Sequence, residues 1–400
     1  MQLLIVGNFD FRADTACSIR VRGLACALQH AGHRVAVVDS RPGASPAGES
    51  WTLRCHPSAA PVEGTSIDEY ADGMMHRAPA GLRGLFLGDV AAQFIRDAAL
   101  RADAIILYGT QLSYLHHMRG LARDMGALLL LDVVEWYGAA DLPGGRFGPF
   151  ALANSYSMRR ASLRADGHSV ISKRLAAHYA AARRPLCILP PMFEPSPPQP
   201  KLSRIDGRIH FAYAGSPGRK EAIGEFLAVL RDLTDPTSGV TLHLVGLSED
   251  DLRALSPESC GPAHVTRCYG RVPNAQARAI VASCDFSLLL RPPKRSNQFG
   301  FPSKLAESMA VGTPAFANLF SDLADVLEPG RNALIVDDLS RGAILDGLQR
   351  SIAMEPRHRE AMARAAHETA ATKFSPASNA PAADRWLAEA AARFAGSGRA

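Results

Sequence analysis

The sequence lacks the features that mark several common classes of protein. No apolar run reaches the roughly 20 residues that a membrane-spanning helix needs. The seven cysteines form no Cys-x-x-Cys pair, so we expect no structural zinc site and a reduced, cytoplasmic location. Residues 1–7 carry neither a basic leader nor a cleavage site, and they are expected to form a first strand.

An excess of charge of one sign is also missing. The 44 Lys and Arg residues face 39 Asp and Glu, a net charge of +5, and no lysine-arginine tract appears. We therefore expect no nucleic-acid partner, while the small excess suits an anionic small molecule or acidic lipid headgroups. No Asp-x-Asp follows an expected strand, so no metal bridging a diphosphate is implied.

What the chain does contain is a twice-repeated alternation of short aliphatic runs and longer helical patterns. Four hundred residues suit two domains, and buried parallel strands between helices predict an α/β fold. We expect two Rossmann-like doubly wound parallel-sheet domains facing a cleft, with ligands at the carboxyl ends of the strands. The predicted bounds are 1–190 for the first domain, 191–202 for a proline-rich linker, 203–375 for the second domain and 376–400 for a helix able to pack back on the first.

A turn at residues 213–220 is the first candidate binding element. It reads Tyr-Ala-Gly-Ser-Pro-Gly-Arg-Lys, between an expected strand at 209–214 and an expected helix at 221–233. Arg219 and Lys220 oppose the macrodipole at that helix end, and an anion bound beside them would account for their position. The alternative is a solvated pair of cations after a turn.

A second candidate element runs from residue 290 to residue 314. Pro302 suits the start of a helix, and Ser303 offers an N-cap. The backbone amides of residues 303–305 would then face a diphosphate at a positive helix end. Glu307, one turn inside, is able to accept hydrogen bonds from both hydroxyls of a ribose, or is an ordinary first-turn glutamate favoured by the dipole.

Residues 300–314, Gly-Phe-Pro-Ser-Lys-Leu-Ala-Glu-Ser-Met-Ala-Val-Gly-Thr-Pro, resemble the signature of the family-4 retaining glycosyltransferases of the GT-B fold. They are most similar to the bacterial surface-polysaccharide branch. Weaker matches follow in the expected order at residues 132–136, 165–172, 190–191, 213–220, 290–291 and 330–332.

The resemblance implies a hexosyl or other glycosyltransferase of polysaccharide biosynthesis, in the cytoplasm or at the inner face of the membrane. The first domain would bind the acceptor and the second a UDP- or GDP-linked sugar, with retention of configuration and without a metal or other cofactor. The acceptor would be a saccharide, a lipid-linked glycan or a small molecule.

The resemblance also assigns roles to residues. Arg219 and Lys220 would contact the diphosphate, Glu307 the ribose, and residues 269–273 would lie beside the nucleobase. The full set of candidates is Arg219, Lys220 and Glu135 for catalysis, and Gly215, Ser216, Gly270, Arg271, Val272, Arg291, Gly300, Phe301, Ser303, Lys304, Leu305 and Glu307 for substrate binding.

In the first domain, Asp132 and Glu135 lie just beyond an expected strand at 127–132. Either residue is able to orient the acceptor or the donor sugar; the alternatives are that Asp132 caps the following segment and that Glu135 pairs with a surface cation. A functional role is favoured for Glu135, and both interpretations stay open for Asp132. Arg20 and Arg22 start the first helix, where one of them is able to contact donor or acceptor, although a solvated face is favoured. Residues 74–87 mix large apolar and basic side chains, as in a helix lying on a bilayer, although a core-packing helix is favoured.

Phe299 stands eight residues before Glu307, where the family often has a glutamate that meets the sugar. Two alternatives therefore stay open. One is a nucleotide-sugar epimerase or hydrolase on the same fold, and the other is a catalytically silent GT-B subunit that binds a nucleotide.

Overall fold

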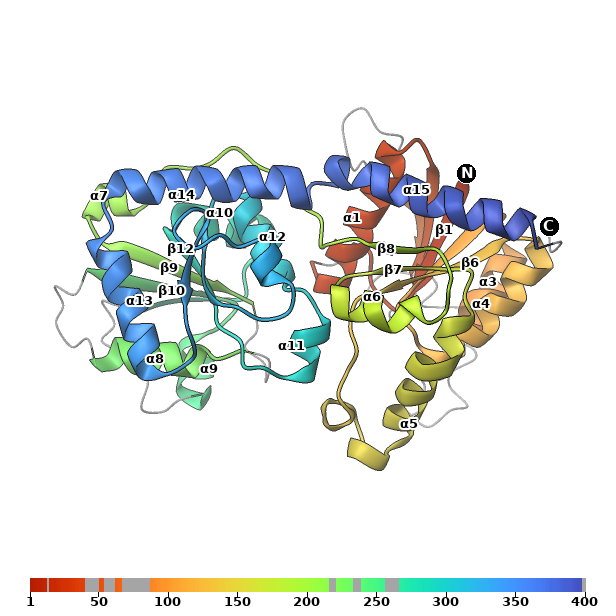
Figure 1. Cartoon of the computed structure of the whole chain (residues 1–400), viewed down its shortest axis with the longest axis horizontal. Helices are drawn as coiled ribbons and strands as arrows, with labels where there is room; N and C mark the ends of the chain where they lie inside the picture. The colour runs from red at the N-terminus through yellow and green to blue at the C-terminus, as the bar shows by residue number, and fades with distance from the viewer. Residues whose placement is uncertain are drawn as a thin grey trace. The chain divides into compact units, whose positions relative to one another are not determined.

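The chain folds into two compact units, as a computed structural model of the protein shows (Figure 1). The structure describes residues 1–12, 14–39, 50–53, 62–66, 87–215, 221–232, 239–255 and 266–397. Unit 1 comprises Met1–Met192 and Pro376–Ala400, and unit 2 comprises Phe193–Ser375. Unit 1 is thus assembled from two separate stretches of sequence.

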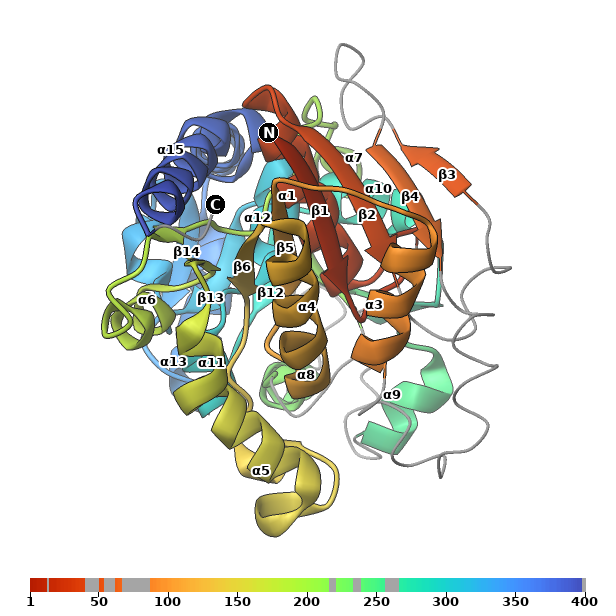
Figure 2. The ribbon, with the colours of Figure 1, turned by 90° about the vertical axis from the view of Figure 1, so that its right-hand side faces the viewer.

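Unit 1 is built on an eight-stranded sheet with the order β3-β4-β2-β1-β5-β6-β7-β8. Figure 2 shows β1, β2 and β4 side by side within it. All neighbouring strands are parallel except β3, which pairs antiparallel with β4 at the edge. The strands are β1 (Gln2–Gly7), β2 (Arg34–Asp39), β3 (Ser50–Leu53), β4 (Val62–Ser66), β5 (Ala104–Tyr108), β6 (Leu128–Val133), β7 (Gly167–Val170) and β8 (Leu186–Ile188).

The helices of unit 1 begin and end at recognisable capping residues. Thr15 caps α1, Ser172 caps α6 as predicted, and α4 ends at Gly126 in the left-handed conformation. The C-terminal helix α15 packs on α1, where Trp386 and Leu387 join the core beneath the sheet. The helices described are α1 (Ala16–His30), α3 (Leu87–Asp97), α4 (Leu112–Met125), α5 (Pro149–Tyr156), α6 (Lys173–Ala180) and α15 (Pro376–Ala395), with the short turns η2 (Ala139–Asp141), η3 (Gly145–Phe147), η4 (Ser157–Ala161) and η5 (Ser162–Arg164).

Unit 2 is built on a six-stranded parallel sheet with the order β11-β10-β9-β12-β13-β14. Counted from its own first strand, this is the Rossmann order 3-2-1-4-5-6, which reverses direction between β9 and β12. Phe211, Phe226, Phe286 and Phe316 meet with ring centroids 5.3–5.7 Å apart and fill its core. The strands are β9 (Ile209–Ala214), β10 (Val240–Val245), β11 (Thr266–Gly270), β12 (Phe286–Leu289), β13 (Ala315–Asn318) and β14 (Ala333–Val336).

Helices flank this second sheet in the same alternating way. The Ser248–Asp251 pair that begins α9 exchanges the hydrogen bonds of a capping box. The helices described are α7 (Ser203–Asp206), α8 (Ile223–Asp232), α9 (Glu249–Leu255), α10 (Asn274–Ser283), α11 (Arg295–Phe299), α12 (Ser303–Ala310), α13 (Arg341–Ala353) and α14 (Pro356–Thr369), with the turns η6 (Leu323–Asp325) and η7 (Ala370–Phe374).

The proline-rich stretch after Met192 is tied down on unit 2. The amide of Phe193 donates to the carbonyl of Phe374, and that of Ser196 donates to Ala310. Lys201 is buried, and its Nζ donates to the carbonyls of Ala282 and Gly312 and to the Thr313 hydroxyl at 2.8–3.0 Å. These residues are therefore a docked strap rather than a free spacer.

The predicted fold class is confirmed in both units, each a doubly wound α/β domain with a parallel Rossmann-like sheet. Within the part of the chain that the structure describes, no helix is long and apolar enough to cross a bilayer. Residues 74–86 of the segment considered for bilayer contact lie outside the described residues, and Leu87 begins α3.

Candidate functional site

The candidate site lies in unit 2 at the carboxyl ends of β9 and β12. The strand order reverses there, and loops leaving neighbouring strands diverge to opposite faces of the sheet, which opens a crevice for a ligand. Tyr213 stands at the end of β9, Arg291 two residues beyond β12, and Lys304 in the first turn of α12. Glu221, just before α8, completes the group.

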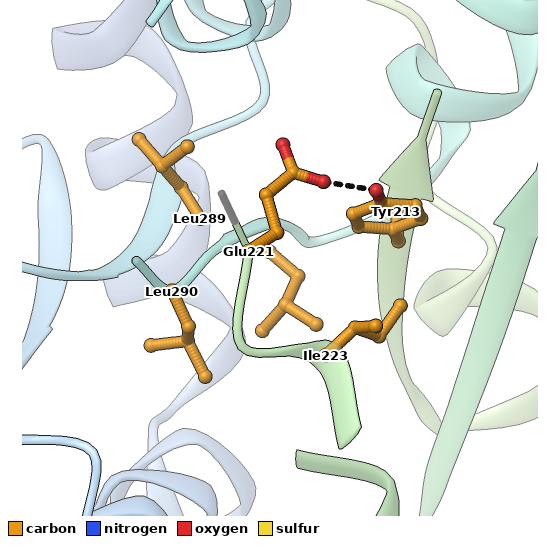
Figure 3. A pocket seen from close by; sticks show the side chains of 6 residues that line it. Tyr213, Glu221, Ile223, Leu289 and Leu290 are labelled. Atoms are coloured by element: carbon orange, nitrogen blue, oxygen red, sulfur yellow. Dashed lines mark hydrogen bonds between the residues drawn. The ribbon is translucent and has the colours of Figure 1, made fainter. Parts of the chain in front are cut away.

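One carboxylate holds these side chains together. Oε1 of Glu221 accepts from Nζ of Lys304 at 2.7 Å and from Nη2 of Arg291 at 3.1 Å. The other carboxylate oxygen accepts the Tyr213 hydroxyl, the contact drawn in Figure 3. A pocket of about 10 Å³ beside it, with room for about one water molecule, is lined by Tyr213, Glu221, Ile223, Leu288, Leu289 and Leu290.

The charges of this cluster are largely withdrawn from water. The Glu221 side chain is 8% exposed, that of Arg291 14% and that of Lys304 23%. Burial by itself would raise the pKa of Glu221, but the charges of Lys304 and Arg291 lower it below its ordinary value. Burial also lowers the pKa of Lys304, although the negative charge of Glu221 acts to raise it. The cluster carries two cations and one anion, so a net positive charge faces the crevice.

Besides Glu221, two residues hold Arg291 in place, Asn318 and Phe320. The side-chain amide of Asn318, at the end of β13, accepts from the Arg291 amide at 2.9 Å and donates to its carbonyl at 3.0 Å. The Phe320 ring lies 5.7 Å from the guanidinium carbon, within cation–π range. The Nε of Arg291 is buried without a hydrogen-bond partner among the described residues. It is a donor that a ligand or a water molecule would satisfy.

Three glycines lie at the carboxyl ends of the neighbouring strands β9, β10 and β11. Gly215, Gly246 and Gly270 have φ values of 131°, 96° and 62°, which disfavour other residues. The amide of Gly215 donates to Val245, and that of Gly246 donates to Gly270. A Cβ on Gly215 would lie 2.8 Å from Lys304 Nζ, so the end of that side chain would have to shift in addition to the backbone strain.

The start of α12 differs in detail from the prediction. Pro302, not Ser303, occupies the N-cap, and no side chain caps the helix, because Ser303 is already its first helical residue. The amide of Leu305 donates to the Pro302 carbonyl at 3.1 Å, and its side chain is buried in the core. The first-turn amides of Ser303 and Lys304 precede any carbonyl of their own helix and so suit an anion.

Glu307 lies near the start of α10, next to the segment that the resemblance places beside the nucleobase. Oε1 of Glu307 lies 3.4 Å from Nδ2 of Asn274, the residue after the 269–273 segment. Within that segment Arg271 is exposed and Val272 is half-buried.

The remaining candidates of unit 2 fall into two groups. Gly300 and Phe301 have structural contacts, since the Gly300 carbonyl accepts from Ser321 at 2.7 Å and the Phe301 ring lies 5.7 Å from Phe374. The predicted residues Ser216, Arg219 and Lys220 lie outside the described residues. The structure brings their flanking residues, Gly215 and Glu221, to the cluster.

In unit 1 the solvated face expected for Arg20 and the capping alternative for Asp132 are wrong. Arg20 is 4% exposed and Asp132 is fully buried, and the two form a bidentate pair with N–O distances of 2.7 and 3.0 Å. Arg20 also donates to the carbonyls of Leu189 and Pro190. The pair joins α1, β6 and the chain leaving β8, and Asp132 does not cap the next segment. Glu135 is half-buried in the loop after β6.

Sequence reasoning missed the residue at the centre of the site. Glu221 directly follows Arg219-Lys220, and an acid beside two cations at a helix start was the available signal. Asn318 and Gly246 were missed as well, because their roles depend on strand neighbours that are distant in sequence.

Comparisons with known proteins agree with this geometry. Residues 220–385 match the model of a family described as glycosyl transferase-like. No curated protein has a significant match. Sucrose-phosphate synthase from Thermosynechococcus elongatus aligns with a TM-score of 0.71 at 15% identity, over 99% of this chain and 100% of that one.

Two further solved structures contain nucleotide sugars. Anabaena HepE in complex with UDP-glucose aligns with a TM-score of 0.66 at 14% identity, over 97% of this chain and 99% of that one. An E. coli trehalose-6-phosphate structure bound with UDP-2-fluoro glucose aligns with a TM-score of 0.67 at 9% identity, over 98% and 99%. These likenesses establish the GT-B fold of the chain.

Proposed function

We propose that this protein is a glycosyltransferase that uses a nucleotide sugar. The observation that carries the proposal is the Lys304–Glu221–Arg291 cluster, with its net positive charge at the switch point of a Rossmann sheet. The glycosyl transferase-like match over unit 2, and the UDP-sugar complexes of proteins with the same fold, support the same conclusion.

In this proposal, Lys304 and Arg291 bind the donor diphosphate together with Arg219, Lys220 and the first-turn amides of α12. The ribose hydroxyls donate to Glu307, and the base lies beside Gly270, Arg271 and Val272. Glu221 contacts no donor atom. It is a positioning residue that keeps both cations aimed at the crevice, at the cost of one compensating negative charge.

The finer features of the reaction are part of the proposal. The bond from the anomeric carbon to the diphosphate breaks, a bond to an acceptor hydroxyl forms on the same face, and the hydroxyl proton leaves with the nucleoside diphosphate. Preorganised cations stabilise that leaving group without a metal, and each such contact is worth about 10²–10³ in rate. The acceptor is a glycan, a glycolipid or a small molecule oriented by Glu135, in polysaccharide assembly in the cytoplasm.

The test is a release assay. The purified protein is incubated with UDP- and GDP-sugars, with and without a cell-envelope extract, and free nucleoside diphosphate is measured. We expect acceptor-dependent release that Lys220→Ala abolishes. Epimerised donor would instead indicate the epimerase, and nucleotide binding without turnover would indicate a silent subunit. Absence of any nucleotide binding would refute the donor site.

A further inference from the structure

A projection of unit 1 gathers the largest exposed apolar side chains near one another. It comprises residues 137–161, which include α5 and its π-helical continuation η4, and we call it the α5 projection. Both Figure 1 and Figure 2 show α5 standing away from the sheet of unit 1. Its apolar side chains are Phe147, 84% exposed, Leu152, 60%, Tyr156, 51%, and Tyr137, 41%.

The base of the projection is rigidly attached. Met158 and Ala161 are buried, the Ser157 hydroxyl donates to the Thr110 carbonyl, and His178 contacts the Met158 carbonyl at 2.9 Å. Arg119 of α4 donates to the Ala161 carbonyl at 2.9 Å. The exposed apolar side chains are therefore held outward by a fixed support and do not belong to an unfolded segment.

The exposed positions follow a helical stripe. Leu152 and Tyr156 are four residues apart in α5 and lie along one face, and Arg159 and Arg160 are exposed in the π-helical turn that follows. Phe147 precedes the helix at the tip, with the Arg146 guanidinium carbon 6.0 Å from its ring centroid. Along the stripe, apolar side chains at the outer end give way to arginines nearer the body.

This order of side chains fits a bilayer surface. Apolar side chains enter the boundary between headgroups and acyl chains, tyrosines sit at the headgroups, and arginines pair with anionic lipids. The projection has three arginines, Arg146, Arg159 and Arg160, against one acid, Asp141. Eight helical residues span about 12 Å, too short to cross a bilayer core of about 30 Å, so α5 can only lie at the interface.

We propose that the α5 projection binds unit 1 to the surface of an anionic phospholipid bilayer. Phe147 and Leu152 enter the interface, and Arg159 and Arg160 contact lipid phosphates. The proposal goes beyond the sugar-transfer reaction, because binding to vesicles requires neither donor nor acceptor, and it holds or fails separately from it.

The test is sedimentation of the full chain with phosphatidylcholine vesicles with and without phosphatidylglycerol. We expect pelleting that depends on phosphatidylglycerol and weakens with salt. F147S/L152S should lower the partition coefficient at least about tenfold, because two large apolar side chains lose their burial. R159E/R160E should lower it by a similar factor, because each basic residue near the surface contributes about 1 kcal/mol.

Matched controls separate the projection from the rest of the surface. Ile205→Ser removes an 82% exposed apolar side chain from unit 2, and R357E/R385E reverses two arginines elsewhere; both should pellet as the wild type does. The fluorescence of the tryptophan that Phe147→Trp introduces should be quenched by brominated phospholipid. The proposal is overturned if the wild type does not pellet with the vesicles. It is also overturned if F147S/L152S pellets as strongly as the wild type. Self-association of the wild type that F147S/L152S abolishes, without vesicle binding, assigns the projection to a second copy and overturns it too.

Discussion

Nζ of Lys304 lies 2.7 Å from Oε1 of Glu221, and Arg291 shares that same oxygen at 3.1 Å. A carboxylate between two cations lowers their repulsion while leaving one positive charge in excess. It also explains why an acid stands directly after Arg219-Lys220, where an anionic donor is expected. One carboxylate, Glu221, therefore holds both described cations of the site.

Replacing Glu221 tests that arrangement. E221Q should raise the donor KM about 10- to 100-fold with a smaller fall in kcat, because charge-assisted hydrogen bonds worth about 1.5–3 kcal/mol no longer orient the cations. Steady-state kinetics with saturating acceptor measure the split. E225Q, an exposed first-turn glutamate of α8, is the control. Equal donor KM values in E221Q and wild type would show that Glu221 does not position the two cations for the donor.

Glu307 is expected to recognise the ribose diol. E307A should raise the donor KM at least about tenfold, and it should also erase the preference for a nucleoside diphosphate over its 2′-deoxy analogue as a competitive inhibitor. Inhibition constants for both compounds check this, with the exposed Glu368→Ala as control. A variant that keeps the wild-type preference would place the ribose elsewhere.

The Arg20–Asp132 pair is expected to matter for folding rather than for catalysis. Arg20→Met leaves the Asp132 carboxylate buried and unpaired, which should lower the free energy of unfolding by about 3–5 kcal/mol. The double variant R20M/D132N should recover part of that loss. Urea denaturation of these proteins, and of the control Arg34→Met at an exposed strand position, gives the values. Wild-type stability in Arg20→Met would contradict the assignment.

Because of Lys201, the free energy of unfolding is expected to increase with pH above about pH 8. Burial lowers the pKa of Lys201 from 10.5 to about 8. Between these pH values the unfolded chain binds more protons than the folded one, so stability increases as the pH rises from 8 to 10.5. The difference between wild type and Lys201→Met in free energy of unfolding should grow by about 3 kcal/mol over that window. A difference independent of pH would mean that Lys201 stays protonated throughout.

The regular elements followed from the sequence because their patterns are local. The strand Ile209–Ala214 lies at its predicted position, since a continuous aliphatic and aromatic run marks it. The edge strand β3 and the strand β4 fall in a Pro-, Ser- and Gly-rich region that offers no such pattern.

The site was predictable only where its parts are contiguous. The signature around Lys304 predicted a donor-binding helix start, but the partners of Lys304, Tyr213 and Glu221, lie more than eighty residues earlier and are brought to it by the sheet topology. The burial of Arg20 was unpredictable for the same reason, because its acceptors on Asp132 and Leu189 are more than a hundred residues away in sequence.

The discontinuous make-up of unit 1 also has a consequence for synthesis on the ribosome. Ala383, Trp386, Leu387 and Ala390 of α15 complete a core whose other buried members lie between Leu3 and Met192. During translation the face of α1 that they cover stays exposed until all of unit 2 has been synthesised. The nascent protein therefore passes through a stage in which unit 2 is complete and unit 1 still presents an apolar surface, the kind of intermediate that chaperones bind.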